Sequence, residues 1–173
     1  MDRVLKSYLS LTRRAAMLAV LLAPTRLQAG AHPCPPPRVL FVCPAGTVKS
    51  ALARETLRFR AAELSVPVRV TSRGVHSENH VSPGLAANLK TDGLDPAREP
   101  LRALVGGDIA DADIIIAFDA AAQAPGLEGA RTWDVPSWNS NYSEAKSALS
   151  AHVDRLLAEL RAKPCAAVPR APR

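Results

Sequence analysis

Aromatic residues are scarce in this chain, at 4% of its 173 residues, although 47% of the residues are apolar. A core of this composition must be mainly aliphatic, and the length is sufficient for one domain with a substantial core. Long apolar runs are also missing. The longest, residues 15–23, has nine residues, whereas a membrane-spanning helix needs about 20. The composition therefore predicts a single soluble domain.

The net charge of +6 comes mostly from the N-terminus, where the first 31 residues carry five basic residues and one acidic residue. The rest of the chain has a net charge of only +2. A charge confined to a terminal segment does not indicate a basic binding face on the domain. We therefore expect no nucleic-acid partner.

The N-terminal segment has the three parts of an export signal. A basic region is followed by the nine apolar residues and then by Ala29-Gly30-Ala31, which is similar to a cleavage site. Arg13 and Arg14, directly before the apolar run, resemble a twin-arginine signal. We predict that residues 1–31 are an export signal and that the mature protein is periplasmic or secreted, without a stable membrane anchor. A disordered or amphipathic N-terminal helix is the alternative.

The stretch from residue 39 to residue 50 organises the chain. An apolar strand ends on Cys43, a short loop containing Gly46 follows, and a helix begins at Ser50. In such a turn the backbone N–H groups and the helix dipole converge on one point, which favours an anion. A cysteine beside it has a stabilised thiolate and can act as a nucleophile. The predicted anion-binding residues are Ala45, Gly46, Thr47, Val48 and Lys49.

Strand-like and helical segments alternate after this point. The expected strands are residues 38–43, 68–72, 114–118 and 131–135. The expected helices cover residues 50–64, a segment from Pro83 to Gly93, residues 100–105, and a last helix from Ser143 that Pro164 ends. This alternation predicts a single α/β domain over residues 32–165, with about four parallel strands flanked by helices and with residues 166–173 as a disordered tail. The first long helix is expected to bury Leu52, Leu57 and Phe59.

Three cysteines are few, and export makes their pairing relevant. Cys34 precedes the first strand, and the last helix delivers Cys165 to the same edge of the sheet, opposite the predicted anion site. We therefore predict a Cys34–Cys165 disulfide. Two unpaired surface thiols are the alternative, because topology alone cannot test the Cα separation that a bridge requires.

The pattern of Cys43 with Lys49-Ser50 resembles the C-x5-R-S signature of the low-molecular-weight protein tyrosine phosphatase family, whose fold the thioredoxin-coupled arsenate reductases share. Further segments resemble the family in order, and the resemblance spans residues 38–162; these segments are residues 71–75, 81–95, 110–119 and 133–136. The resemblance implies that Cys43 attacks phosphorus, Lys49 binds the equatorial oxygens and Ser50 supports the thiolate. It implies neither a cofactor nor a metal.

Three positions depart from the family pattern. Lys49 replaces an arginine and lacks its bidentate fork. Pro44 has no N–H to offer an anion. Ser137 stands where the family has the aspartate that protonates the leaving group, and losing a general acid typically costs ~10²–10⁴ in rate. Asp119 and Asp134 are candidate replacements.

Three functions follow as hypotheses. The first is a weak exported phosphatase that hydrolyses aryl phosphates through a cysteinyl-phosphate. The second is a degenerate domain that binds an oxyanion or a phosphorylated partner without turnover, and the third is a thiol redox or arsenate reductase-like protein. The predicted partners are a phosphorylated small molecule, a phosphotyrosine protein or a free oxyanion. The plainer alternatives are that Cys43 is a buried strand-end cysteine and Lys49 an exposed lysine.

Overall fold

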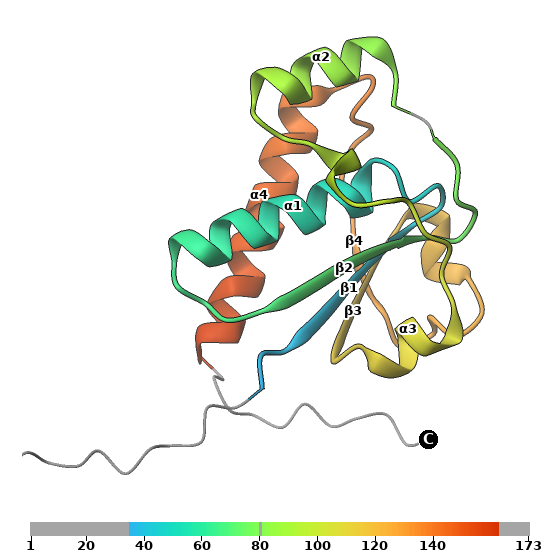
Figure 1. Ribbon diagram of the computed structural model, residues 1–173, viewed down its shortest axis with the longest axis vertical. Coiled ribbons are helices and arrows are strands. Elements are labelled where there is room, and N and C mark those ends of the chain that lie inside the picture. Colours follow the sequence, from blue (N-terminus) through green and yellow to red (C-terminus); the bar gives the residue numbers. More distant parts are fainter. Residues whose placement is uncertain (1–34, 80, 163–173) are drawn as a thin grey trace, which may run out of the picture. The chain divides into compact units, whose positions relative to one another are not determined.

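The computed structural model describes residues 35–79 and 81–162 (Figure 1). Four parallel strands form one sheet in the order β2-β1-β3-β4. They are β1 (Arg38–Cys43), β2 (Arg69–Gly74), β3 (Ile114–Phe118) and β4 (Arg131–Trp133). The α-helices are α1 (Lys49–Glu63), α2 (Pro83–Thr91), α3 (Gly106–Asp111) and α4 (Tyr142–Ala162), and the short 3-10 helices are η1 (Pro96–Arg98) and η2 (Asp119–Gln123). The expected single α/β domain with a four-stranded parallel sheet is confirmed.

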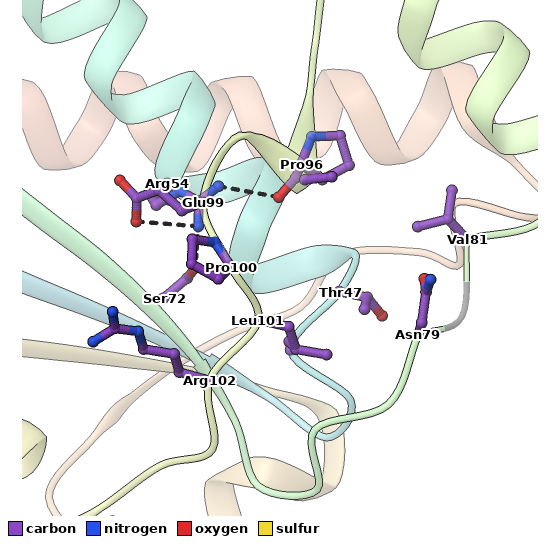
Figure 2. A pocket seen from close by; sticks show the side chains of 12 residues that line it. Thr47, Arg54, Ser72, Asn79, Val81, Pro96, Glu99, Pro100, Leu101 and Arg102 are labelled. Carbon is purple, nitrogen blue, oxygen red and sulfur yellow. Dashed lines mark hydrogen bonds and ion pairs between the residues drawn. The ribbon is translucent and has the colours of Figure 1, made fainter.

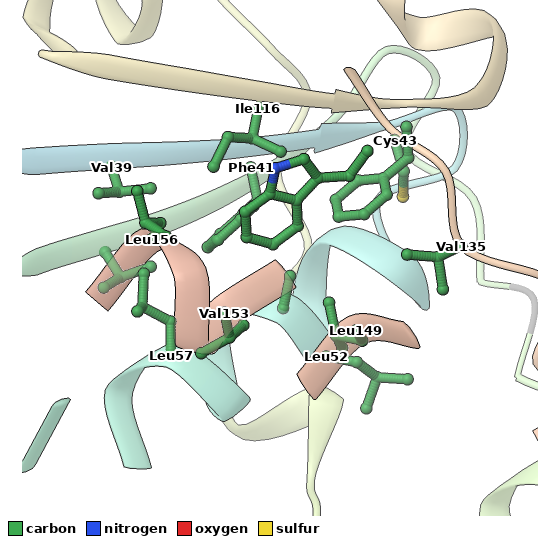
Figure 3. Close-up of a cluster of buried hydrophobic side chains, with 14 of the residues drawn as sticks. Val39, Phe41, Cys43, Leu52, Leu57, Ile116, Val135, Leu149, Val153 and Leu156 are labelled. Atoms are coloured by element: carbon green, nitrogen blue, oxygen red, sulfur yellow. The ribbon is translucent and has the colours of Figure 1, made fainter. Parts of the chain in front are cut away.

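The two faces of β1 belong to two separate parts of the core. Val39, Phe41 and Cys43 face the larger cluster, which α1 and α4 close with aliphatic side chains (Figure 3). Leu40 and Val42 face a smaller cluster on the other side of the sheet. Burial on both faces explains why this strand is apolar at every position after Arg38 rather than alternating. Because β1 is a central strand of the sheet, its last residue, Cys43, lies at the middle of the carboxyl edge.

The segment before α3 differs from the sequence prediction. Residues 100–105 were expected to form a helix, but this segment is extended, and helical structure lies on either side of it in η1 and α3. Its backbone pairs with the end of β2: Gly74 N–H donates to the Arg102 carbonyl at 3.1 Å, and Leu104 N–H donates to the Gly74 carbonyl at 2.8 Å. Tertiary pairing with an edge strand has therefore overridden a weak local preference for helix.

A second prediction fails on α1. Leu52 and Leu57 are fully buried as expected, but Phe59 is 63% exposed. Position 59 lies about 200° around the helix from position 57, so it faces solvent when Leu57 faces the core.

The expected export signal, both ends of the predicted Cys34–Cys165 disulfide and the tail from residue 166 lie outside the described residues. Within residues 35–79 and 81–162, no helix is long and apolar enough to cross a membrane.

Candidate active site

Residues 44–48 form the loop between β1 and α1, at the carboxyl edge of the sheet where parallel α/β folds place their ligands. Gly46 has φ +78°, and a Cβ atom there would lie 2.8 Å from the Gly74 nitrogen and 2.7 Å from Leu101 Cδ1. Only glycine satisfies both the left-handed backbone and the close approach. The loop is thus seated directly on the end of β2.

The sulfur of Cys43 is held by two groups. The Gly46 N–H donates to Sγ at 3.1 Å, and Ser50 Oγ also lies 3.1 Å from Sγ. The Ser50 hydroxyl is fully buried, 3.3 Å from the Gly46 carbonyl and 3.2 Å from the Arg73 carbonyl. Both Gly46 and Ser50 can donate to a thiolate, which is the charge state that a nucleophile needs.

The loop between β1 and α1 has backbone N–H groups that are available to a ligand. Within the described part of the chain, the N–H groups of Ala45, Thr47 and Val48 have no acceptor. Val48 is the N-cap of α1, so the positive end of the helix dipole points at the same place. Free N–H groups beside a helix start favour a bound oxyanion.

Lys49 reaches across the cleft from the first position of α1. Its ammonium donates to Asp119 Oδ1 at 2.6 Å and to the Val135 carbonyl at 2.5 Å. Asp119 follows β3 directly and has φ +52°, an uncommon backbone conformation that aspartate tolerates. Because an ammonium has three donors, one remains for a ligand.

These groups line a cleft of about 270 Å³. Besides the loop, its walls are Cys43, Asp119 and residues 137–139. Ser137 therefore occupies the wall where the resemblance places a general acid. Of the two candidate replacements, Asp119 lines the cleft, whereas Asp134 is exposed and does not line it.

The structure also adds one group that the sequence did not indicate. Val135 acts through its carbonyl, which no sequence pattern marks. Trp138 is buried against the edge of Tyr142, and its indole nitrogen has no hydrogen-bond partner among the described residues. Burial raises the pKa of Tyr142, and its hydrogen bond to Asp92 raises it further.

A buried charged network lies behind the loop. The Arg54 guanidinium, 3% exposed, donates to Glu55 at 3.0 Å, Ser72 at 2.8 Å and the Pro96 carbonyl at 3.1 Å, and it lies 3.4 Å from Glu99 (Figure 2). It therefore ties α1 to β2 and to residues 96–99, which precede the segment that pairs with Gly74. Helical spacing could have shown its burial, because residue 54 shares a face with residues 57 and 61.

The chain is a parallel α/β domain in which a cysteine at the end of β1 lies beside a loop with free N–H groups at the start of a helix, an arrangement that favours a bound oxyanion. The model of the low molecular weight phosphotyrosine protein phosphatase family matches residues 38–162. The chain belongs to this family.

Solved structures with the same fold include several activities. A low molecular weight protein tyrosine phosphatase from T. tengcongensis has 23% identity and a TM-score of 0.60, over 72% of this chain and 99% of that chain. The YwlE arginine phosphatase from Geobacillus stearothermophilus has 23% identity and a TM-score of 0.59, over 74% of this chain and 95% of that chain. An arsenate reductase in its phosphate-binding state has 19% identity and a TM-score of 0.58, over 71% of this chain and 98% of that chain. No curated protein matches.

Proposed function

We propose that this chain is a weak exported phosphatase, which hydrolyses aryl phosphate monoesters through a cysteinyl-phosphate intermediate. The observation that carries the proposal is the position of Cys43 Sγ, 3.1 Å from both the Gly46 N–H and Ser50 Oγ. The free N–H groups of the loop and the Lys49 ammonium lie beside it in one cleft. Family membership supports the same reaction.

The reaction proceeds in two steps. The Cys43 thiolate attacks phosphorus, the S–P bond forms, and the P–O bond breaks with its electron pair leaving on the phenol oxygen. Water then attacks phosphorus, the S–P bond breaks, and inorganic phosphate leaves with the thiolate restored. Loop N–H groups and Lys49 stabilise the charge on the phosphoryl oxygens in both steps, and Ser50 and Gly46 stabilise the thiolate.

The phosphatase activity is expected to be weak because the cleft lacks a proton donor for the leaving group. Ser137 cannot protonate a phenolate at neutral pH, and Asp119 is paired with Lys49 at 2.6 Å. A missing general acid typically costs ~10²–10⁴ in rate. Leaving groups that depart without a proton should therefore be favoured.

The test compares p-nitrophenyl phosphate, whose phenol is acidic, with phenyl phosphate, on the mature protein and on Cys43→Ser. We expect turnover of the activated ester, at least ~100-fold slower turnover of phenyl phosphate, and no turnover by Cys43→Ser. Equal rates on both esters would show that a general acid is present. Activity that persists in Cys43→Ser would refute the cysteine mechanism.

Binding without turnover is the second candidate function, and it is favoured because Lys49 and Ser137 line the cleft in place of the arginine and the aspartate of the family pattern. The double variant Lys49→Arg with Ser137→Asp separates the two candidates. If the remaining geometry is competent, phenyl phosphate hydrolysis should rise by at least ~100-fold. An inert double variant that still binds phosphate would favour the binding domain.

A redox or arsenate reductase-like role is the third candidate. Among the described residues, Cys43 has no second cysteine to form a disulfide relay. Mild peroxide followed by a sulfenic-acid probe tests this role, which requires labelling at Cys43.

A further inference from the structure

The Cys43 cleft has a polar wall, residues 137–139, on the side where the family pattern places the proton donor for the leaving group. Ser137 and Asn139 are exposed at this wall, while Trp138 between them is only 3% exposed and packs in the core. Among the described residues that line the cleft, Trp138 is the only aromatic one. An aryl group therefore finds little aromatic surface to stack on, whereas a polar leaving group meets a hydroxyl and an amide.

The amide of Asn139 is oriented by its hydrogen bond with Ser82. Ser82 Oγ accepts from the Leu85 N–H at 3.2 Å, so its own proton is donated to Asn139 Oδ1 at 2.7 Å. The oxygen of the amide is thus engaged, and its nitrogen keeps two N–H donors. Asn139 is therefore a hydrogen-bond donor to a molecule bound in the cleft.

The polar wall is held in place by contacts on its other side. The Asn141 N–H donates to the Ser137 carbonyl at 3.0 Å, and the Trp138 ring packs edge-on against Tyr142 with ring centroids 5.4 Å apart. Donors that are fixed before the reaction stabilise charge as it develops, without a cost of reorganisation.

The polar wall supplies hydrogen bonds to a leaving anion rather than a proton. Ser137 is not an acid at neutral pH, and the carboxylate of Asp119 is paired with Lys49 at 2.6 Å. A phenol loses its proton only near pH ~10, whereas a carboxylic acid does so near pH ~4 and leaves readily as an anion. A carboxylate also spreads its charge over two oxygens, which can accept from two donors at once. The wall therefore fits a carboxylate leaving group better than a phenolate.

We propose that the preferred substrates of this site are acyl phosphates, the mixed anhydrides of a carboxylic acid and phosphoric acid. The carboxylate leaves against Ser137 and Asn139, which donate to its oxygens. The inference rests on the proposed function, because it takes Cys43 as the nucleophile and the loop between β1 and α1 as the phosphate site.

The reaction needs no co-reactant except water. The Cys43 thiolate attacks phosphorus, the S–P bond forms, and the bond from phosphorus to the acyl oxygen breaks with its electron pair on the carboxylate. The carboxylate departs without a proton. Water then attacks phosphorus, the S–P bond breaks, and dihydrogen phosphate leaves with the thiolate restored.

The test compares benzoyl phosphate with phenyl phosphate and p-nitrophenyl phosphate on the mature protein, after subtraction of the protein-free rates. Benzoyl phosphate should exceed phenyl phosphate in kcat/KM by at least ~100-fold. Asn139→Asp keeps an acceptor for Ser82 but removes the N–H donors. It should lower the ratio of kcat/KM for benzoyl phosphate to that for p-nitrophenyl phosphate by at least about tenfold, because only the acyl ester has a carbonyl oxygen for the amide. Ser140→Asp adds the same charge at an exposed position outside the cleft and should keep the ratio.

The outcomes separate this inference from the proposed function. If p-nitrophenyl phosphate is hydrolysed through Cys43, an unchanged ratio in Asn139→Asp or a benzoyl phosphate rate no higher than that of phenyl phosphate overturns the inference alone. A benzoyl group instead of a phosphoryl group on Cys43, seen by mass spectrometry after an acid quench, also overturns it. Hydrolysis of benzoyl phosphate that depends on Cys43 and Asn139, without hydrolysis of either aryl ester, supports the inference while the aryl phosphatase proposal fails. Absence of all three activities overturns both.

Discussion

Replacing Arg54 by methionine should destabilise the domain strongly. The Arg54 guanidinium is 3% exposed and contacts Glu55, which is 6% exposed, at 3.0 Å. Removing one partner of a buried pair leaves an uncompensated charge and typically costs about 3–5 kcal/mol. Glu55 would retain Arg98 at 3.4 Å and Arg58 at 3.7 Å. We therefore expect the lower end of that range, about 3 kcal/mol.

This loss can be converted into a melting temperature. A domain of roughly 130 residues has an unfolding entropy near 60 °C of about 0.27 kcal/mol/K, so the Tm of Arg54→Met should fall by about 11 °C. Circular dichroism melts measure it, with Arg131→Met as the control. Arg131 pairs with Glu159 at 2.7 Å, but both side chains are about half exposed, and such pairs contribute about 0–1 kcal/mol.

The control should thus lose at most about 4 °C. Equal melting temperatures for Arg54→Met and Arg131→Met would refute the reasoning, because burial would then make no difference to the value of the ion pair. The Arg54 variant should also hydrolyse p-nitrophenyl phosphate more slowly, since Arg54 anchors the Pro96 segment that precedes the Gly74 pairing.

Gly46→Ala should abolish p-nitrophenyl phosphate hydrolysis, because its Cβ would meet the Gly74 backbone at 2.8 Å with φ at +78°; Gly84→Ala, with open space around it, should keep wild-type rates. Burial alone would raise the pKa of Asp108, but the hydrogen bond from Arg73 and the charge of Arg73 lower it overall. The stabilisation by this carboxylate is therefore present above about pH 4 and lost as pH falls through its folded pKa. Urea unfolding from pH 6 to pH 2 should show a steeper loss for the wild type than for Asp108→Asn, and identical slopes would contradict this assignment.

The strands and the position of the loop between β1 and α1 could be predicted from the sequence because their signals are local. Apolar runs covered on both faces mark β1 and β3, and Ser82 followed by Pro83 marks the start of α2, where Ser82 Oγ accepts from the Leu85 N–H at 3.2 Å. The family signature predicted that Cys43, Lys49 and Ser50 lie around one loop, and the structure brings these three residues together at its two ends.

The parts that could not be predicted depend on contacts between distant residues. Residues 100–105 are extended because Gly74 offers both its N–H and its carbonyl to them. The Lys49 ammonium is directed by a main-chain carbonyl, that of Val135, 86 residues away in sequence. None of these features has a signature in a single stretch of sequence.

The central claim is that Cys43 accepts a phosphoryl group from the substrate. Mature protein mixed with p-nitrophenyl phosphate and quenched in acid within one turnover can be digested and analysed by mass spectrometry. We predict one added phosphoryl group on the peptide that contains Cys43, with none in Cys43→Ser. Hydrolysis that proceeds without phosphorylation of Cys43, or phosphate found on another residue, would contradict the account.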